Sequence, residues 1–179
     1  MTDATGPGGG SDGITVLVVD DEPDLADLYG AWLSDDFDVR IAYDGESALD
    51  DLDDAVDVVL LDRRMPDRSG DDVLHAIRQR GLDCRVAMVT AVEPDLDIID
   101  LGFDDYLQKP IERADLVGTV ERLHRRSQYD DRMRRYFAAV KKRTLLEDRL
   151  PPGERSENEQ FQALERTIED LEVTVDEVV

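Results

Sequence analysis

The sequence predicts an α/β fold, in which a parallel sheet of five strands is covered on both faces by five helices and is followed by a helical tail. The prediction rests on two patterns, the apolar runs of strands and the helical spacing of the segments between them. Short continuous apolar runs, rich in β-branched residues, alternate along the first 110 residues with segments whose apolar residues recur at helical spacing. Continuous apolar runs are typical of strands that the helices of βαβ units bury on both faces.

Each element is expected for a local reason. The strands are expected where the apolar runs lie, at residues 14–19, 39–42, 56–61, 86–89 and 105–107. The helices are expected where helical spacing takes over, at residues 23–34, 45–52, 71–80 and 95–101 and after Pro110. Pro23 suits the first turn of a helix, and Gly81 and Gly102 suit positions just after a helix end.

A helical tail is expected after the last strand. Residues 112–149 contain no proline and one glycine, so we expect one long helix or two collinear helices. The Pro-Pro-Gly sequence at 151–153 must break this helix, and a second helix is expected from about Ser156, with Glu159 completing a capping box. An apolar seam at heptad spacing follows, formed by Phe161, Leu164, Ile168, Leu171, Val175 and Val178. The seam favours either an antiparallel hairpin or a coiled coil between subunits.

Charge is distributed in three blocks. The 179 residues carry a net charge of −23, from 31 Asp, 13 Glu, 18 Arg and 3 Lys. Residues 1–110 have a net charge of −20, residues 111–150 of +4 and residues 151–179 of −7. An acidic, lysine-poor surface resembles the proteins of salt-accumulating halophiles, in which concentrated salt screens self-repulsion. The overall charge also argues against a protein that coats nucleic acid by bulk electrostatics.

The composition excludes further classes of protein. The single cysteine, Cys84, rules out an internal disulfide framework and a cysteine-based zinc site. Apolar runs such as residues 16–19 and 58–61 are far shorter than the ~20 residues that cross a bilayer, so we expect no membrane partner. Residues 1–13 are rich in glycine and lack the features of a signal peptide, which predicts a disordered leader on a cytoplasmic protein.

Polar residues stand where the expected strands end. Asp20 and Asp21 follow the first strand, Asp62 follows the third, Thr90 follows the fourth, and Lys109 follows the fifth. Because the carboxyl ends of parallel strands share one crevice, we expect these side chains to meet. Converging carboxylates need a cation, and Mg²⁺ prefers oxygen ligands. A carboxylate beside Mg²⁺, an ammonium and a hydroxyl can accept a phosphoryl group.

These residues resemble the signature of the CheY-like receiver domain of two-component response regulators. The matching elements are Asp20-Asp21 after Val-Leu-Val-Val, the run Asp62-Arg-Arg-Met-Pro-Asp-Arg-Ser-Gly70, Thr90-Ala91 and Tyr106-Leu-Gln-Lys109-Pro110. The resemblance covers residues 14–127. It implies a flavodoxin-like sheet with the strand order 2-1-3-4-5.

The resemblance also implies a role for each residue. Asp62 would be the phosphoacceptor for a histidine kinase, with Mg²⁺ as the cofactor. Lys109 would pair with the phosphoryl group, Thr90 would move to hydrogen-bond it, and Tyr106 would rotate inward in response. The implied ligands of Mg²⁺ are Asp20, Asp21, Asp62 and the backbone carbonyl of Arg64.

The end of the chain resembles the HalX output domain, which follows receiver domains in haloarchaea. This resemblance rests on the arginine-rich helix, the break at Pro151 and the acidic last helix. We therefore expect a leader at 1–13, a receiver domain at 14–127 and a helical output segment at 128–179, broken at 151–153. A homodimer through the helix 112–127 and the tail is one of the two arrangements that the sequence leaves open, and a hairpin within one chain is the other.

Two alternatives belong to other classes. A haloacid-dehalogenase-like phosphatase needs a second aspartate two positions after its nucleophile, where this chain has Arg64. A DNA-binding transcriptional regulator would use the basic helix 122–149 to contact phosphates. Against it, the helix after the break is acidic and no helix-turn-helix spacing is present. The sequence therefore favours a response regulator, a phosphoacceptor switch rather than a turnover enzyme, with DNA binding as the alternative output.

Overall fold

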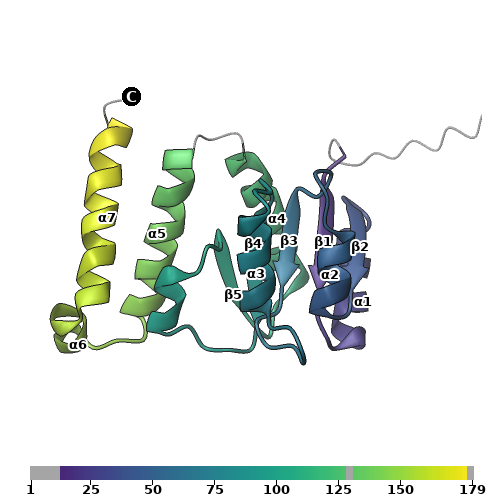
Figure 1. Cartoon of the computed structure of the whole chain (residues 1–179), viewed down its shortest axis with the longest axis horizontal. Helices are drawn as coiled ribbons and strands as arrows, with labels where there is room; N and C mark the ends of the chain where they lie inside the picture. The colour runs from purple at the N-terminus through teal and green to yellow at the C-terminus, as the bar shows by residue number, and fades with distance from the viewer. Residues whose placement is uncertain (1–12, 128–130, 177–179) are drawn as a thin grey trace, which may run out of the picture.

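The computed structural model describes residues 13–127 and 131–176 and has a five-stranded parallel sheet at its centre (Figure 1). The strands are β1 (Thr15–Val19), β2 (Asp38–Ala42), β3 (Val58–Leu61), β4 (Arg85–Thr90) and β5 (Asp105–Gln108). Their order across the sheet is β2-β1-β3-β4-β5, and every neighbouring pair is parallel. The predicted flavodoxin-like order is therefore confirmed. The predicted leader lies largely outside the described residues.

Helices cover both faces of the sheet and form two apolar cores. On one face α1 (Pro23–Leu33) and α4 (Arg113–Arg126) pack together and against the strands. On the other face lie α2 (Gly45–Asp51), α3 (Gly70–Gln79) and the 3₁₀ helix η1 (Leu96–Asp100). Each predicted helix of the α/β part is present, but the fourth is a short 3₁₀ helix. None of the described helices has the length and apolar character that crossing a membrane requires.

Side chains cap the helices that lead away from the site. The Asp44 carboxylate accepts a hydrogen bond from Ser47 N (2.7 Å) at the start of α2. Ser69 and Asp72 form a reciprocal capping box at the start of α3. Such caps satisfy backbone N–H groups that have no partner within the helix. They fix where α2 and α3 begin, and with them the loops that follow β2 and β3.

The expected long helix from 112 to 149 is wrong, because the chain reverses direction within it. After α4, the helix α5 (Asp131–Glu147) returns antiparallel along the edge of the sheet (Figure 1). Arg122 of α4 and Lys141 of α5 both pair with Asp105, and the Arg126 guanidinium lies 4.6 Å from the centroid of the Phe137 ring. The reversal buries the apolar face of α5 against η1 and β5, which a straight helix would leave in water.

Two further helices complete the tail. They are α6 (Pro152–Glu157) and α7 (Glu159–Asp176), and α7 runs antiparallel to α5 (Figure 1). The predicted start of this helix at Ser156 is wrong, because Ser156 lies within α6. Instead, the Asn158 side chain accepts a hydrogen bond from Phe161 N (2.9 Å) and caps α7. We call α5, α6 and α7 together the tail hairpin.

The predicted apolar seam of α7 packs within the chain. Phe161, Leu164, Ile168 and Leu171 are all buried, and the first three belong to the same core as Phe103 of the α/β part. The side chains of Val175 and Val178 lie outside the described residues. The helices α5 and α7 contact each other and η1 extensively. Of the two arrangements expected for the tail, the structure therefore has the hairpin.

We predict that Gly70→Ala destabilises the fold. A Cβ at position 70 would lie 2.0 Å from the Asp62 carbonyl oxygen and 2.7 Å from the Arg63 Cα, and neither backbone atom can move freely. Overpacking of this kind lowers the free energy of unfolding by about 1–3 kcal/mol, which urea unfolding in concentrated KCl measures. Gly153→Ala is the matched control, because its Cβ would meet nothing within 4 Å. Equal stability of both variants would contradict the prediction.

Candidate functional site

A cleft of about 860 Å³ lies at the carboxyl ends of the strands. Asp21, Asp62, Thr90 and Lys109 line it together with Arg64 and the loop that follows β4. The parallel arrangement places these residues together, because β1, β3, β4 and β5 all end at this edge. The structure thus brings together the strand-end residues that the sequence singled out.

Lys109 lies between two buried carboxylates. Its Nζ is 2.7 Å from Asp20 Oδ2 and 3.1 Å from Asp62 Oδ2. Asp20 and Asp62 are buried, whereas Asp21 is half-buried. Two buried negative charges without a counter-charge would repel each other strongly, so the ammonium stabilises their proximity. This contact joins the ends of β1, β3 and β5 into one site.

The protonation of Asp20 and Lys109 reflects this contact. Burial raises the pKa of Asp20, and the hydrogen bond from Lys109 opposes the shift only in part. Burial alone would lower the pKa of Lys109, but the hydrogen bond from its ammonium to Asp20 and the charge of Asp62 outweigh burial, so the pKa is raised. Lys109 therefore carries its positive charge at neutral pH.

The three aspartates have the donors that a hard divalent cation needs. Carboxylate oxygens of Asp20, Asp21 and Asp62 all lie within 4.8 Å of one another. One ammonium leaves three carboxylates with an excess of negative charge, and oxygen donors suit Mg²⁺. The backbone N–H of Arg64 donates to Asp62 Oδ1 at 3.3 Å, which places this residue beside the cluster. The residues present therefore fit a Mg²⁺ site.

Thr90 and Tyr106 are linked through the backbone of Val92. Thr90 Oγ1 accepts a hydrogen bond from Val92 N (3.2 Å), and the Tyr106 hydroxyl donates to Val92 O (2.5 Å). Tyr106 is 2% exposed and packs at 5.5 Å from the Phe103 ring, so its ring already points inward. Burial raises the pKa of Tyr106, which keeps the hydroxyl a hydrogen-bond donor.

Arg63 is a structural link that sequence reasoning missed. Its guanidinium makes a two-pronged contact with Asp71 of α3 (3.0 and 2.9 Å) and contacts Asp97 of η1 at 2.7 Å. The hydrogen bonds to Asp71 raise the pKa of Arg63, although its burial acts in the opposite direction. The residue after Asp62 therefore ties together two helices beside the cleft. Its position next to Asp62 is the only signal in the sequence.

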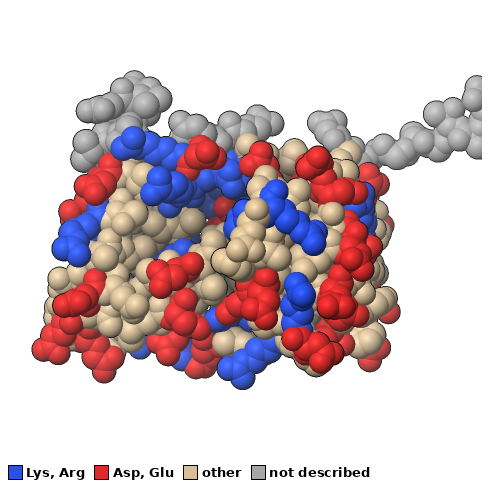
Figure 2. All heavy atoms as spheres, viewed as in Figure 1, with Lys and Arg blue, Asp and Glu red and all other residues tan. Residues whose placement is uncertain are grey.

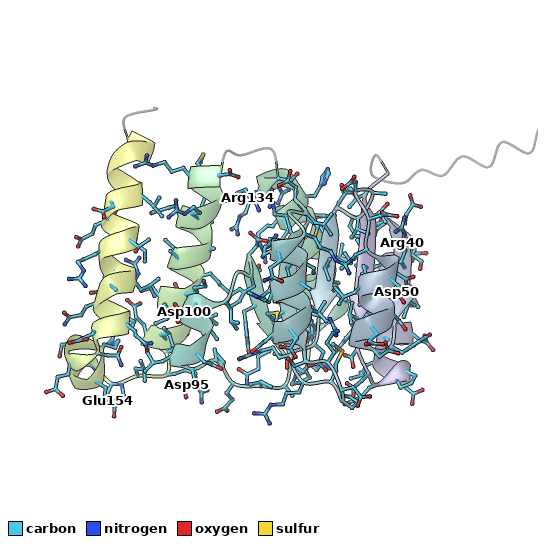
Figure 3. All side chains as sticks on the ribbon, viewed as in Figure 1. Arg40, Asp50, Asp95, Asp100, Arg134 and Glu154 are labelled. Atoms are coloured by element: carbon cyan, nitrogen blue, oxygen red, sulfur yellow. The ribbon has the colours of Figure 1, made fainter. Side chains whose placement is uncertain are left out.

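The tail also reaches the cleft, which sequence reasoning did not anticipate. Arg149, Leu150 and Glu154, from the turn between α5 and α6 and from α6 itself, line the same cleft as Asp62. Figure 3 shows Glu154 of α6 and Asp95, which precedes η1, at the same end of the molecule. The site is therefore built from both parts of the chain.

Among the described residues, basic side chains of the tail contact the first part of the chain at three positions, Lys141, Lys142 and Arg149. Lys141 pairs with Asp105 (3.3 Å), and Arg149 pairs with Glu93. Lys142 is buried, and its Nζ donates to the carbonyls of Ile99 (3.0 Å) and Leu101 (2.5 Å). Burial lowers the pKa of Lys142. The two lysines of α5 thus point toward the acidic first part of the chain, whereas Arg134 and Arg143 pair with acids of α5 itself.

Comparisons with known families divide the chain into two parts. A model of the response regulator receiver domain matches residues 16–121, and a model of the HalX domain matches residues 125–179. A solved receiver domain from Vibrio parahaemolyticus, of a candidate LuxO repressor, is 30% identical with a TM-score of 0.60. The match covers 66% of this chain and 95% of that domain.

Two similar proteins are named as regulators of transcription. A candidate transcriptional regulator of Haloferax volcanii is 56% identical over 75% of this chain. The regulatory protein CpxR of Escherichia coli K12 is 42% identical over 65% of it. The chain spans 23% of the former and 51% of the latter. The receiver model matches more than half of the chain. The chain therefore belongs to the response regulators, with a receiver domain followed by a HalX domain.

Proposed function

We propose that this response regulator accepts a phosphoryl group on Asp62 from a histidine kinase, and that the phosphoryl group changes how the tail hairpin packs. The observation that carries the proposal is the contact of Lys109 Nζ with Asp20 and Asp62. It holds an ammonium beside a carboxylate that lines an open cleft. This is the arrangement that an anionic phosphoryl group requires.

The transfer uses groups that the chain supplies. A carboxylate oxygen of Asp62 attacks phosphorus, the P–N bond to the kinase histidine breaks, and its electron pair stays on the imidazole nitrogen. The Lys109 ammonium neutralises charge on the phosphoryl oxygens. Asp20, Asp21, Asp62 and the Arg64 carbonyl would hold Mg²⁺, which when bound supplies further positive charge to the same oxygens.

Thr90 transmits the effect of phosphorylation from Asp62 to the core beneath the tail. When its hydroxyl turns to donate to the phosphoryl group, it leaves the N–H of Val92, whose carbonyl accepts from Tyr106. Tyr106 belongs to the same core as Ala139 and Leu146 of α5. A shift of this loop therefore alters the surface on which the tail hairpin packs. The receiver domain at 14–127 acts on the output segment at 128–179 through this core.

DNA binding is a second candidate, favoured by the names of the relatives and by one basic area. Figure 2 shows Lys and Arg side chains gathered over the N-terminal end of α5. Arg125, Arg132 and Arg135 are exposed at this corner of the chain. Arg132 also donates to the Asp170 carbonyl (3.4 Å). The other described Lys and Arg side chains of the segment 122–149 contact groups of the chain, so this corner is the part of the segment that best suits a DNA backbone in the docked form. The homodimer through 112–127 stays a separate proposal.

We predict that Asp62→Asn abolishes phosphorylation. The full chain in concentrated KCl with Mg²⁺ and acetyl phosphate, a small phosphodonor, gains the mass of one phosphate by intact mass spectrometry, and a chelator suppresses the gain. The variant gains none, because an amide cannot attack phosphorus as a carboxylate does. Asp50→Asn, on the exposed surface of α2, serves as control and gains like the wild type. Phosphorylated Asp62→Asn protein would refute the assignment.

The phosphoryl mimic beryllium fluoride should loosen the tail hairpin. With Mg²⁺ present, we expect faster amide hydrogen exchange in η1 and α5, because the Thr90–Val92–Tyr106 link ends in the core that holds them. Light scattering on the same samples shows whether dimers form at the same time. Unchanged exchange in residues 96–147 with the mimic bound would rule out this route.

The second candidate makes a separate prediction. A DNA duplex binds in concentrated KCl, and the double variant Arg125→Glu, Arg135→Glu weakens that binding, because the reversed charges face the phosphates. The control is the double variant Glu165→Arg, Glu169→Arg, which replaces negative by positive charges on the exposed face of α7, at another surface. Absence of binding with and without the phosphoryl mimic would eliminate the DNA candidate.

A further inference from the structure

The turn between α5 and α6 lies at the mouth of the phosphoacceptor cleft. Arg149 and Leu150 of this turn line the cleft that also contains Asp62, Thr90 and Lys109. The output domain therefore supplies residues to the receiver's own site. Of the basic side chains that line the cleft, Arg64 and Lys109 come from the receiver domain and Arg149 comes from the tail.

Arg149 has a weak partner in the described state. Its guanidinium pairs with Glu93 on the loop after β4. The side chains of Arg149 and Glu93 are 37% and 61% exposed. Exposed ion pairs contribute little to stability, because water solvates both charges well. An anion that binds more strongly and lies close by can therefore replace Glu93 as the partner of Arg149, and little free energy is lost when the exposed ion pair breaks.

Phosphorylation of Asp62 would create such an anion inside the cleft. A phosphoryl group adds negative charge and three strong acceptor oxygens. Lys109 already contacts two carboxylates, so it neutralises only part of this charge. A guanidinium donates two parallel hydrogen bonds and binds phosphate oxygens more specifically than an ammonium. Arg149 is the guanidinium that the tail places at the rim of this cleft.

We infer that Arg149 binds the phosphoryl group on Asp62 and exchanges Glu93 for it. The inference rests on the proposed function, since it needs a phosphoryl group at Asp62. Arg149 lies two residues after the end of α5 and three residues before α6, so the exchange moves the corner of the tail hairpin relative to the loop after β4. The HalX domain thereby senses phosphorylation by direct contact as well as through the receiver's core.

Binding of beryllium fluoride tests this contact. The full chain in concentrated KCl with Mg²⁺ is titrated with the mimic, and the bound fluorides are followed by ¹⁹F NMR. Concentrated salt screens long-range effects of charge, so the titration reports contacts. We expect Arg149→Leu to bind the mimic roughly tenfold more weakly. Arg143→Leu removes the same charge from a guanidinium that pairs with Glu147 away from the cleft, and it should bind like the wild type.

A substitution of Glu93 provides a second test, in which the expected change in affinity for the mimic is the opposite. Glu93→Gln removes the carboxylate that competes with the mimic for Arg149, so we expect tighter binding of the mimic. In the Arg149→Leu background the same change should have no effect, whereas a general effect of charge would persist there. Hydrogen exchange of the corner at 147–154 supplies an independent readout, because the mimic should alter it in the wild type and not in Arg149→Leu.

The outcomes separate the inference from the function on which it rests. A wild type that binds no mimic and accepts no phosphate overturns the proposed role of Asp62. A wild type that binds the mimic, with Arg149→Leu binding equally well, overturns the inference alone. Equal weakening in Arg149→Leu and Arg143→Leu also overturns it, because the effect would then be one of overall charge.

Discussion

The contact of Lys109 with Asp20 and Asp62 is the constraint on which the rest of the site depends. Buried carboxylates at neighbouring strand ends repel each other, and the ammonium offsets that repulsion at 2.7 and 3.1 Å. Lys109 follows β5 at the edge of the sheet, whereas Asp20 and Asp62 follow β1 and β3. The contact therefore depends on the positions of three strands, and it makes the site a property of the sheet rather than of one loop.

The sequence predicted this sheet and its site because both follow from local patterns. Apolar runs mark the buried strands, and parallel strands bring their carboxyl ends together, so Asp62, Thr90 and Lys109 had to meet. The reversal after α4 was not predictable in this way, because helical spacing continues through it without a proline. The pairs of Arg63 with Asp97 and of Arg149 with Glu93 were missed because they join residues 34 and 56 positions apart, and only the tertiary fold determines such pairs.

The three blocks of charge acquire a structural meaning in the tail hairpin. Its basic helix lies between the acidic receiver domain and the acidic α7 (Figure 1). Lys141 reaches Asp105, and Lys142 donates to the carbonyls of Ile99 and Leu101 at the end of η1. Apolar residues of α5 and α7 join the core of the receiver domain at the same surface. Charge and burial thus select the same docked arrangement.

The loop after β4 connects the cleft to the tail in two ways. Thr90 and Val92 lead inward, through the Tyr106 hydroxyl, to the core that α5 shares. Glu93, the next residue, leads outward to Arg149 at the corner of the hairpin. Because Thr90, Val92 and Glu93 lie within four successive positions of the chain, the proposed movement of Thr90 toward Asp62 would displace the groups that Tyr106 and Arg149 contact. In the proposed mechanism, this single loop would control the packing of α5 along its buried face and the position of the turn that follows it.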